Sequence, residues 1–189
     1  MFKLSAALLF CSLLSAADLR YWIEPCSRPE TGCRATDPEL AQWALEAWQK
    51  AAGPALSMVR NDTPAHAQIR LYWASRQEGL YGEARPIMVD GVRGAEVYVL
   101  PDVVPRGEKD ALLRDAIVYL TCLHETGHAL GLQHTANFAD IMYSFEYDGD
   151  IAAYFGRYRR LLAARSDIRK HSGISDGDRR QLTAIFPAR

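Results

Sequence analysis

The sequence lacks an excess of either charge. Its 189 residues include 22 lysines and arginines against 23 aspartates and glutamates, which gives a formal net charge of −1. This balance offers no electrostatic case for nucleic acid or an anionic membrane surface as the main partner. Charged residues make up 24% of the chain and apolar residues 49%, a composition typical of a folded globule rather than a disordered segment.

Long hydrophobic runs are also missing. An apolar stretch at residues 4–14 is too short for an ordinary transmembrane helix, and no later segment is longer and equally apolar. This stretch follows a short basic start and precedes the small residues Ser-Ala-Ala, which is the pattern of a signal peptide. We therefore predict a signal peptide at residues 1–17, cleaved before Asp18, and a secreted or periplasmic protein.

Cysteine is scarce, with four in the chain. Cys11 lies inside the predicted signal peptide, and the bulky residue before it disfavours a lipoprotein cleavage site. Cys26 and Cys33 close a short loop rich in Pro, Ser and Gly, and an exported chain meets oxidants. We therefore predict a disulfide between them, with two free thiols as the alternative. Cys122 falls in an apolar helical pattern and is expected to be a buried thiol.

Repeats, linkers and low-complexity tracts are absent as well, which favours a single domain over residues 18–189. We expect this domain to be a monomer. Alternating apolar positions predict strands at 19–23, 56–59, 67–73, 80–88 and 95–100. Helical spacing predicts helices from Thr36 or Asp37 to Gly53, over 110–130, over 151–165, and from Ser175 to about Phe186. These elements predict one mixed α/β (α+β) domain.

The most informative segment reads HETGHALGLQH. Residues four apart on a helix lie on nearly the same face, so His124 and His128 can bind one ion while Glu125 lies beside it. Gly131 can end the helix in left-handed backbone and turn His134 towards a third coordination position. Three neutral imidazoles leave one position of a tetrahedral Zn²⁺ open to water, and Glu125 is placed to act as the general base.

Met142 follows eight residues after His134, within the segment Asp-Ile-Met-Tyr-Ser. The whole pattern resembles the metzincin metalloproteases, whose signature is HExxHxxGxxH followed by a methionine-containing turn. The spacing and the Met142-Tyr143 pair are most similar to the matrixin branch. The resemblance implies a twisted mixed five-stranded sheet, an active-site helix ending at the zinc turn, and a C-terminal helix. It also implies one catalytic Zn²⁺ above Met142 and hydrolysis of peptide bonds in peptide or protein substrates.

The resemblance also suggests how a substrate binds. Residues 80–88 would be the edge strand above the cleft, to which a peptide adds by main-chain hydrogen bonds. The segment 145–173 is longer than in a typical matrixin and should form a wall of the pocket that receives the side chain after the cut bond. Phe145 and Tyr147 are its candidate lining residues. The basic residues of this segment are expected to form a solvated helix face, with recognition of an acidic substrate as the alternative.

Some matrixin features have no counterpart in the sequence. Extra histidines for a second, structural zinc are missing near the edge strand, and His66 and His171 are isolated and expected at the surface. Asp90 or Asp102 could hold Ca²⁺, although no calcium motif supports it. A catalytically silent zinc protein that binds a peptide or partner is the alternative function, as is a hydrolase of small amides. Glu125 argues against a silent protein, because three histidines alone would hold the metal.

Overall fold

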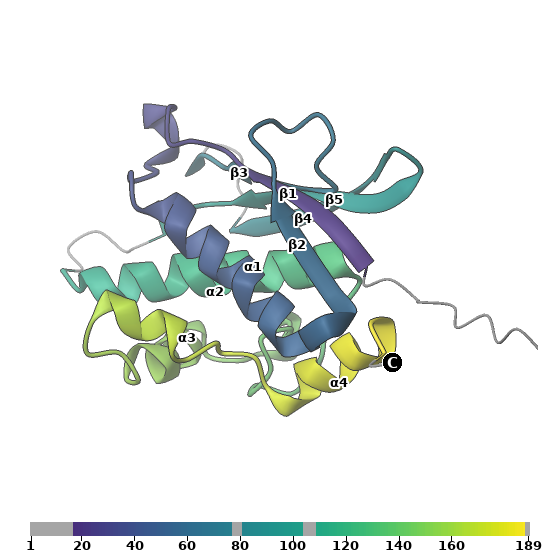
Figure 1. Cartoon of the computed structure of the whole chain (residues 1–189). Coiled ribbons are helices and arrows are strands. Elements are labelled where there is room, and N and C mark those ends of the chain that lie inside the picture. Colours follow the sequence, from purple (N-terminus) through teal and green to yellow (C-terminus); the bar gives the residue numbers. More distant parts are fainter. Residues whose placement is uncertain (1–16, 77–80, 104–108, 188–189) are drawn as a thin grey trace, which may run out of the picture.

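The computed structural model describes residues 17–76, 81–103 and 109–187. Most of the predicted signal peptide, and Leu80 at the start of the predicted edge strand, lie outside these residues. The described residues form a five-stranded sheet and four α-helices, which confirms the predicted mixed α/β class (Figure 1). None of the described helices is long and apolar enough to cross a membrane.

The sheet has the strand order β2-β1-β3-β5-β4. Its strands are β1 (Ala17–Ile23), β2 (Leu56–Arg60), β3 (Ile69–Trp73), β4 (Gly82–Val89) and β5 (Val92–Val99). All neighbours pair in parallel except β4, which is antiparallel to β5. Asp90 and Gly91 connect these two strands with positive φ angles of 51° and 77°, as a two-residue hairpin turn requires. Because β4 stands last in the strand order and pairs with β5 alone, it is an edge strand, as predicted.

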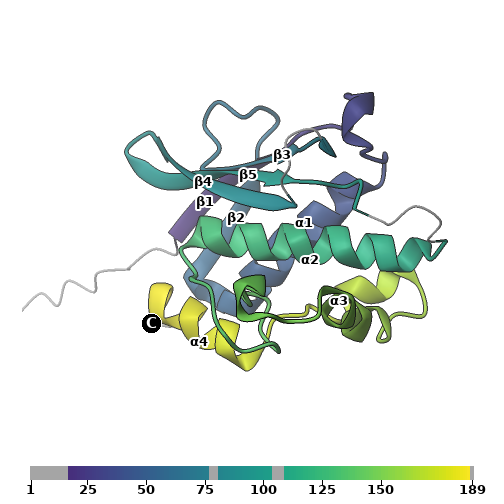
Figure 2. The same cartoon turned by 180° about the vertical axis from the view of Figure 1, so that it is seen from behind.

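The helices lie on one side of the sheet (Figures 1 and 2). They are α1 (Asp37–Ala52), α2 (Ala111–Leu130), α3 (Ile151–Arg159) and α4 (Asp176–Ile185). The Asp110 carboxylate accepts the first free N–H groups of α2, and Ser175 and Asp178 form a capping box at α4. Figure 2 shows α2 running along the sheet beneath β4, with which it makes close contacts.

α1 and α2 pack against each other through the core. The indole N–H of Trp48 donates to the Leu123 carbonyl at 2.9 Å, and the Arg114 guanidinium forms a buried ion pair with Asp37, with Nη2 2.6 Å from Oδ2. Cys122 is a free and fully buried thiol, as predicted, and burial raises its pKa well above the usual value. These contacts fix α2, the helix that carries the predicted metal ligands His124 and His128.

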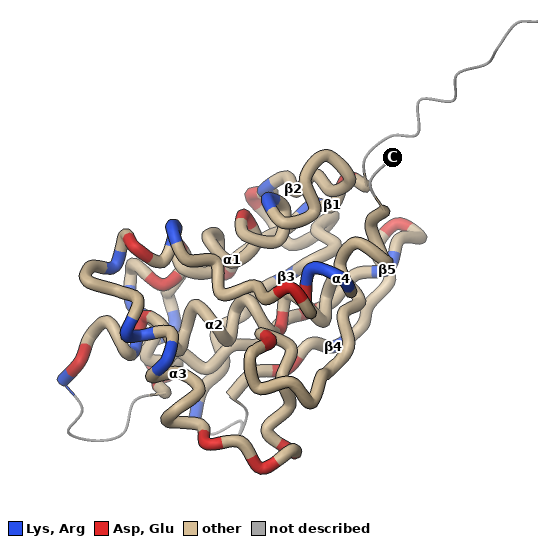
Figure 3. Tube along the Cα trace, turned by 90° about the horizontal axis from the view of Figure 1, so that it is seen from below, with Lys and Arg blue, Asp and Glu red and all other residues tan. Residues whose placement is uncertain are grey.

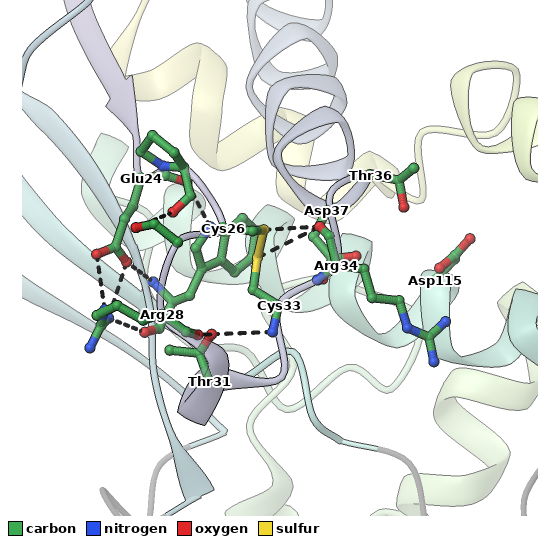
Figure 4. The surroundings of a disulfide bond; sticks show 12 residues. Glu24, Cys26, Arg28, Thr31, Cys33, Arg34, Thr36, Asp37 and Asp115 are labelled. Atoms are coloured by element: carbon green, nitrogen blue, oxygen red, sulfur yellow. Dashed lines mark hydrogen bonds and ion pairs between the residues drawn. A yellow bond between two sulfur atoms is a disulfide. The ribbon is translucent and has the colours of Figure 1, made fainter.

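Cys26 and Cys33 form a disulfide in the loop between β1 and α1 (Figure 4). Their Cα atoms are 5.4 Å apart, within the ordinary range for a disulfide. The same loop is held by Glu24, whose carboxylate pairs with Arg28 at 3.1 Å. The backbone N–H of Arg34 donates to the Asp37 carboxylate at 2.8 Å. Asp37 also pairs with Arg114 of α2, so it connects the loop to that helix.

The third helix is shorter than predicted. A helix over 151–165 was expected, but α3 ends at Arg159. At Leu161 and Leu162 the backbone hydrogen bonds join residues three apart instead of four, and Leu162 is buried. The Asp167 carboxylate then accepts the N–H groups of Ala163 and Ala164. Leu161 is left 53% exposed, so the expected continuous apolar side does not form.

Several basic side chains at the end of α3 and after it form ion pairs, which the sequence did not predict. Acidic and basic residues are interspersed along the chain, with basic segments gathered near α3 and on α4 (Figure 3). Most of the cations near α3 pair with carboxylates: Arg159 with Asp110 at 2.8 Å, Arg165 with Asp115 at 3.1 Å, Arg169 with Glu46 at 3.0 Å and Lys170 with Asp167 at 2.7 Å. Three of these pairs fasten the segment to α1, to α2 and to the residue that caps α2. The side chains of Arg169 and Lys170 are still 60% and 70% exposed, so the predicted solvated face describes part of the segment.

Candidate metal centre

The last two turns of α2 carry His124 and His128. The helix ends at Leu130, and Gly131 has a φ of 102°, a left-handed conformation in which its N–H bonds back to the carbonyl oxygens of Gly127 and His128. The chain reverses there and brings His134 back to the helix. Its Nε2 atom lies 3.3 Å from Nε2 of His124 and 3.0 Å from Nε2 of His128.

These separations suit a tetrahedral zinc ion. With Zn–N bonds of about 2.0–2.1 Å, two nitrogen ligands lie about 3.3–3.4 Å apart. The Nδ1 atoms of His124 and His128 lie 2.7 Å and 2.9 Å from the carbonyl oxygens of Ile141 and Leu132. Because a carbonyl oxygen only accepts, each Nδ1 carries the proton and each Nε2 presents its lone pair. Both lone pairs converge on Nε2 of His134, where a cation could be shared by the three rings, so the group fits Zn²⁺.

The protonation states of the site agree with metal binding. Burial lowers the pKa of His124 to about 4 and also lowers the pKa of His128, so both rings are neutral at neutral pH. Neutral imidazole is the form that binds metal. Burial, assisted by the charge of Glu83, raises the pKa of Glu125 to about 8. A cation nearby would lower it again, which leaves a carboxyl group suited to exchanging a proton near neutral pH.

Glu125 lies against the first residue of the edge strand. Its side chain is buried, and a Cβ atom at Gly82 would come within 2.5 Å of the Glu125 Oε1 atom. Only glycine leaves room for the carboxylate at this position. Sequence reasoning missed the role of Gly82, because it depends on how β4 lies over α2.

Met142 packs against the histidine-bearing helix. It is fully buried, and a Cβ atom at Gly127 would lie 2.6 Å from its sulfur. The preceding residue, Ile141, supplies the carbonyl that orients His124. The methionine turn and the end of α2 therefore form one packed unit.

Asp178 holds this methionine turn from the last helix. Its fully buried carboxylate accepts the N–H groups of Ile141 at 2.8 Å and Met142 at 3.2 Å, and also that of Ser175 at 2.8 Å. The sequence predicted that Asp178 caps α4. It did not indicate that the same carboxylate binds the backbone of the methionine turn.

A cavity of about 380 Å³ lies beside the histidines. His124, Glu125 and His134 line one side of it, together with Tyr81 and Gly82 at the start of the edge strand. The other side is apolar and mostly aromatic, lined by Leu120, Tyr143, Phe145, Ile151, Tyr154 and Phe155. Two of the three predicted metal ligands, His124 and His134, thus share one opening with the predicted base and an apolar pocket.

The two predicted pocket residues differ in position. Phe145 lines the cavity, and its ring lies 5.2 Å from that of Tyr154. Tyr147 is not among the lining residues and is 57% exposed; it contributes its carbonyl oxygen, to which the Tyr143 hydroxyl donates at 3.1 Å. Both belong to the 3₁₀ turn η4 (Phe145–Tyr147), in which side chains two residues apart point in different directions.

The remaining candidate ligands lie elsewhere on the surface. Nδ1 of His66 is 3.0 Å from Oδ2 of Asp90, and Asp102 pairs with Arg76 at 2.5 Å. His171 is exposed. Among the described residues, the metal-like groups are the three histidines and a set of Cys26, Cys33 and Asp37, whose cysteines are already joined. Nothing in the described chain supports a calcium site at Asp90 or Asp102.

Comparisons with known proteins bear on the fold alone. No protein-family model matches the chain, and no curated protein sequence matches it either. A chain in the solved GM1-bound form of the ECX AB5 holotoxin shares 13% identity at a TM-score of 0.56, covering 89% of this chain and 79% of that one. The archaemetzincin of Methanopyrus kandleri shares 14% identity over 94% of this chain and 99% of its own, but its TM-score of 0.46 is too low to carry an argument.

Proposed function

We propose that this protein is a zinc-dependent peptidase in which His124, His128 and His134 bind Zn²⁺ and Glu125 is the general base. The observation that carries the proposal is the meeting of three rings: the Nε2 atoms of His124 and His128 lie 3.3 Å and 3.0 Å from Nε2 of His134. The buried carboxylate of Glu125 lines the same open cavity as His124 and His134. Structural zinc sites normally have four protein ligands. The described group has three, which supports a catalytic rather than a structural site.

The residues of the chain divide the chemistry between them. A zinc ion held by the histidines supplies a Lewis acid and lowers the pKa of water to about 7. Glu125 accepts the proton of the attacking water and passes it to the leaving amine. The carbonyls of Ile141 and Leu132 keep the rings of His124 and His128 in the required tautomer. No covalent bond between substrate and protein is needed.

The edge strand and the apolar pocket support a peptide substrate. β4 ends the sheet, so one of its sides has no strand partner in the described structure. A peptide bound along β4 by strand addition would pass Gly82 and Glu125 and place its scissile carbonyl near the histidines. The side chain that follows the cut bond would enter the cavity next to Phe145 and Tyr154.

We further propose a secreted or periplasmic endopeptidase of the matrixin-like type that acts as a monomer. The HExxHxxGxxH pattern and the turn at Met142 support the subtype. The leader-like residues 1–17 and the disulfide between Cys26 and Cys33 support export to an oxidising compartment.

Two measurements, each made with and without a chelator, test the proposal. One is the zinc content of the protein, and the other is its cleavage of an unfolded protein substrate. The wild-type protein should bind one zinc and cleave, and the chelator should abolish cleavage. Glu125→Ala should keep the zinc and lose turnover by roughly 100- to 10,000-fold, because a positioned base contributes about that much. Glu146→Ala, which removes another carboxylate lining the cavity, is the matched control and should keep most activity.

Two results would contradict this assignment in different ways. Wild-type turnover by Glu125→Ala would show that the base is another residue. A wild-type protein that binds zinc yet cleaves no peptide in a proteome-derived library would instead be the catalytically silent binding protein.

A further inference from the structure

A second cavity, of about 350 Å³, lies apart from the metal centre. The two cavities have no lining residue in common. The second is bounded by α1, by the 3₁₀ turn η5 (Arg165–Arg169) with the residues after it, and by the start of α4. Tyr119 reaches it from α2, and its hydroxyl donates to the Ser172 carbonyl at 2.8 Å. The proposed peptidase chemistry uses none of these residues.

Positive charge is concentrated around this cavity. Lys50, Arg169, Lys170 and Arg179 line it, with Glu46 as the single carboxylate. Since the whole chain has a net charge of −1, this concentration is local rather than a consequence of an overall basic protein. Local positive charge attracts anions and raises their concentration at the surface.

Two of the four cations have no partner in the described structure. Arg169 pairs with Glu46 at 3.0 Å, and Lys170 pairs with Asp167 at 2.7 Å. The side chains of Lys50 and Arg179 make no hydrogen bond or ion pair with any described residue, although both line the cavity. Their charges are therefore available to a ligand.

The inner part of the cavity is apolar and supported from several sides. Trp43, Ala47 and Ala51 of α1 contribute to it, and the two alanines leave space that longer side chains would fill. Ile168 is fully buried beside them. The guanidinium of Arg165 lies 4.7 Å from the Trp43 ring, which fixes the indole against the segment after α3. These contacts hold the apolar part in place before any ligand arrives.

We propose that this cavity binds a small organic anion, in which a carboxylate or phosphate group is carried on a short apolar body. Lys50 and Arg179 pair with the anionic group, and Trp43 with its neighbouring alanines contacts the apolar body. The volume lies at the lower end of the range for small-molecule sites, about 300–1,000 Å³, which suits a compact ligand better than an extended acidic peptide.

The test titrates the zinc-loaded protein with benzoate and with phenyl phosphate, and follows the indole N–H signal of Trp43 by NMR. This signal reports on the second cavity, so anions that bind at the zinc do not confuse the result. Benzyl alcohol serves as the uncharged control, and acetate and inorganic phosphate lack the apolar body. A short acidic peptide tests the competing class of ligand. We expect benzoate or phenyl phosphate to bind with a dissociation constant below about 1 mM and the controls to bind more weakly.

Variants locate the binding. Lys50→Ala combined with Arg179→Ala should raise the dissociation constant at least tenfold, the equivalent of about 1.4 kcal/mol. Arg180→Ala is the matched control, because it removes the next arginine of α4, which does not line the cavity. Both altered residues are exposed, so an unchanged thermal midpoint should show that the fold is intact.

Several outcomes would overturn the proposal. These are an unmoved Trp43 signal with both anions, equal binding of benzyl alcohol, or wild-type affinity in the double variant. Binding of the acidic peptide without binding of either small anion would also overturn it, and would make this face a docking surface for an acidic segment instead.

Discussion

The two sides of the cavity at the metal centre are held in different ways. On the metal side, His124 and His128 are oriented by backbone carbonyls, and the methionine turn is held by the buried carboxylate of Asp178. On the opposite side, the hydroxyls of Tyr143 and Tyr154 also donate to backbone carbonyls. Phe145 and Ile151 are held there by packing alone, and they remain 37% and 49% exposed. Hydrogen bonds to fixed backbone groups set the direction of a side chain. Phe145 and Ile151 have no polar side-chain atom to make such a bond, and their exposed parts lack packing neighbours.

This difference indicates which part of the site can change. A metal site needs ligands within a few tenths of an ångström of the required geometry, and its supporting groups must be equally well placed. A specificity pocket tolerates exchange of one apolar side chain for another. We therefore expect substitutions on the metal side to abolish function and substitutions on the opposite side to alter substrate preference.

The largest effect is expected from His134→Ala. The variant removes one of the three proposed ligands, so zinc affinity should fall by more than the roughly 10–100-fold that loss of a group supporting a ligand costs. Zinc retained during dialysis against a competing chelator measures it. His66→Ala, which removes an exposed histidine that pairs with Asp90, should retain wild-type zinc content. Unchanged metal content in His134→Ala would remove this residue from the coordination sphere.

Asp178→Asn should give the next largest effect. An amide replaces a carboxylate that accepts three backbone N–H groups, and hydrogen bonds to a charged group contribute about 1.5–3 kcal/mol each. We expect a lower thermal midpoint together with a zinc affinity reduced by about 10–100-fold. Asp176→Asn, at an exposed position of the same helix, is the control. If zinc affinity stayed at the wild-type value while stability fell, Asp178 would be purely structural.

Phe145→Ala should have a moderate and selective effect. Truncation of one cavity wall should lower kcat/KM by about tenfold for peptides with a large apolar residue after the cut bond, and much less for small residues there. Tyr147→Ala tests the same 3₁₀ turn without altering the cavity lining, and the carbonyl that it uses to bind Tyr143 is retained. Equal losses in the two variants would mean that the turn, rather than the Phe145 ring, determines the preference.

The smallest effect concerns the metal-free protein. Burial raises the pKa of Glu125 from 4.5 to about 8, so the folded state retains a proton that the unfolded state has lost, and stability falls as the pH rises through this range. His124 and His128, whose pKa values are lowered, oppose this trend only below about 6.5. Between pH 6.5 and 8, the free energy of unfolding should fall by up to about 1.4 kcal/mol per pH unit.

Denaturant titration of the chelator-treated protein measures this slope. Glu125→Gln carries no titrating group at the position and should flatten the slope. An equally steep fall in that variant would assign the effect to another residue.

Local spacing explains why parts of the site were predictable. His124 and His128 are one helical turn apart, and Gly131 marks the reversal, so a single short segment determines where three rings meet. The strands and the helix α2 follow from periodicity in the same way. The five-stranded mixed sheet came from the family resemblance, since periodicity alone does not order strands.

Long-range contacts explain what was missed. Gly82 matters because β4 crosses α2 at Glu125, and no pattern in either segment reports that crossing. The early end of α3 depends on Asp167, and the arginines after it pair with α1, more than a hundred residues earlier in the chain. Their carboxylate partners could not be chosen from the sequence, because many exposed acidic residues were equally suitable.

The position of Asp178 in the last helix has a consequence for how the protein is made. During synthesis all three imidazoles emerge from the ribosome before the residue that supports the turn beneath them. An incomplete chain would thus carry the ligands without their support, and we expect peptide cleavage only after the final helix has docked.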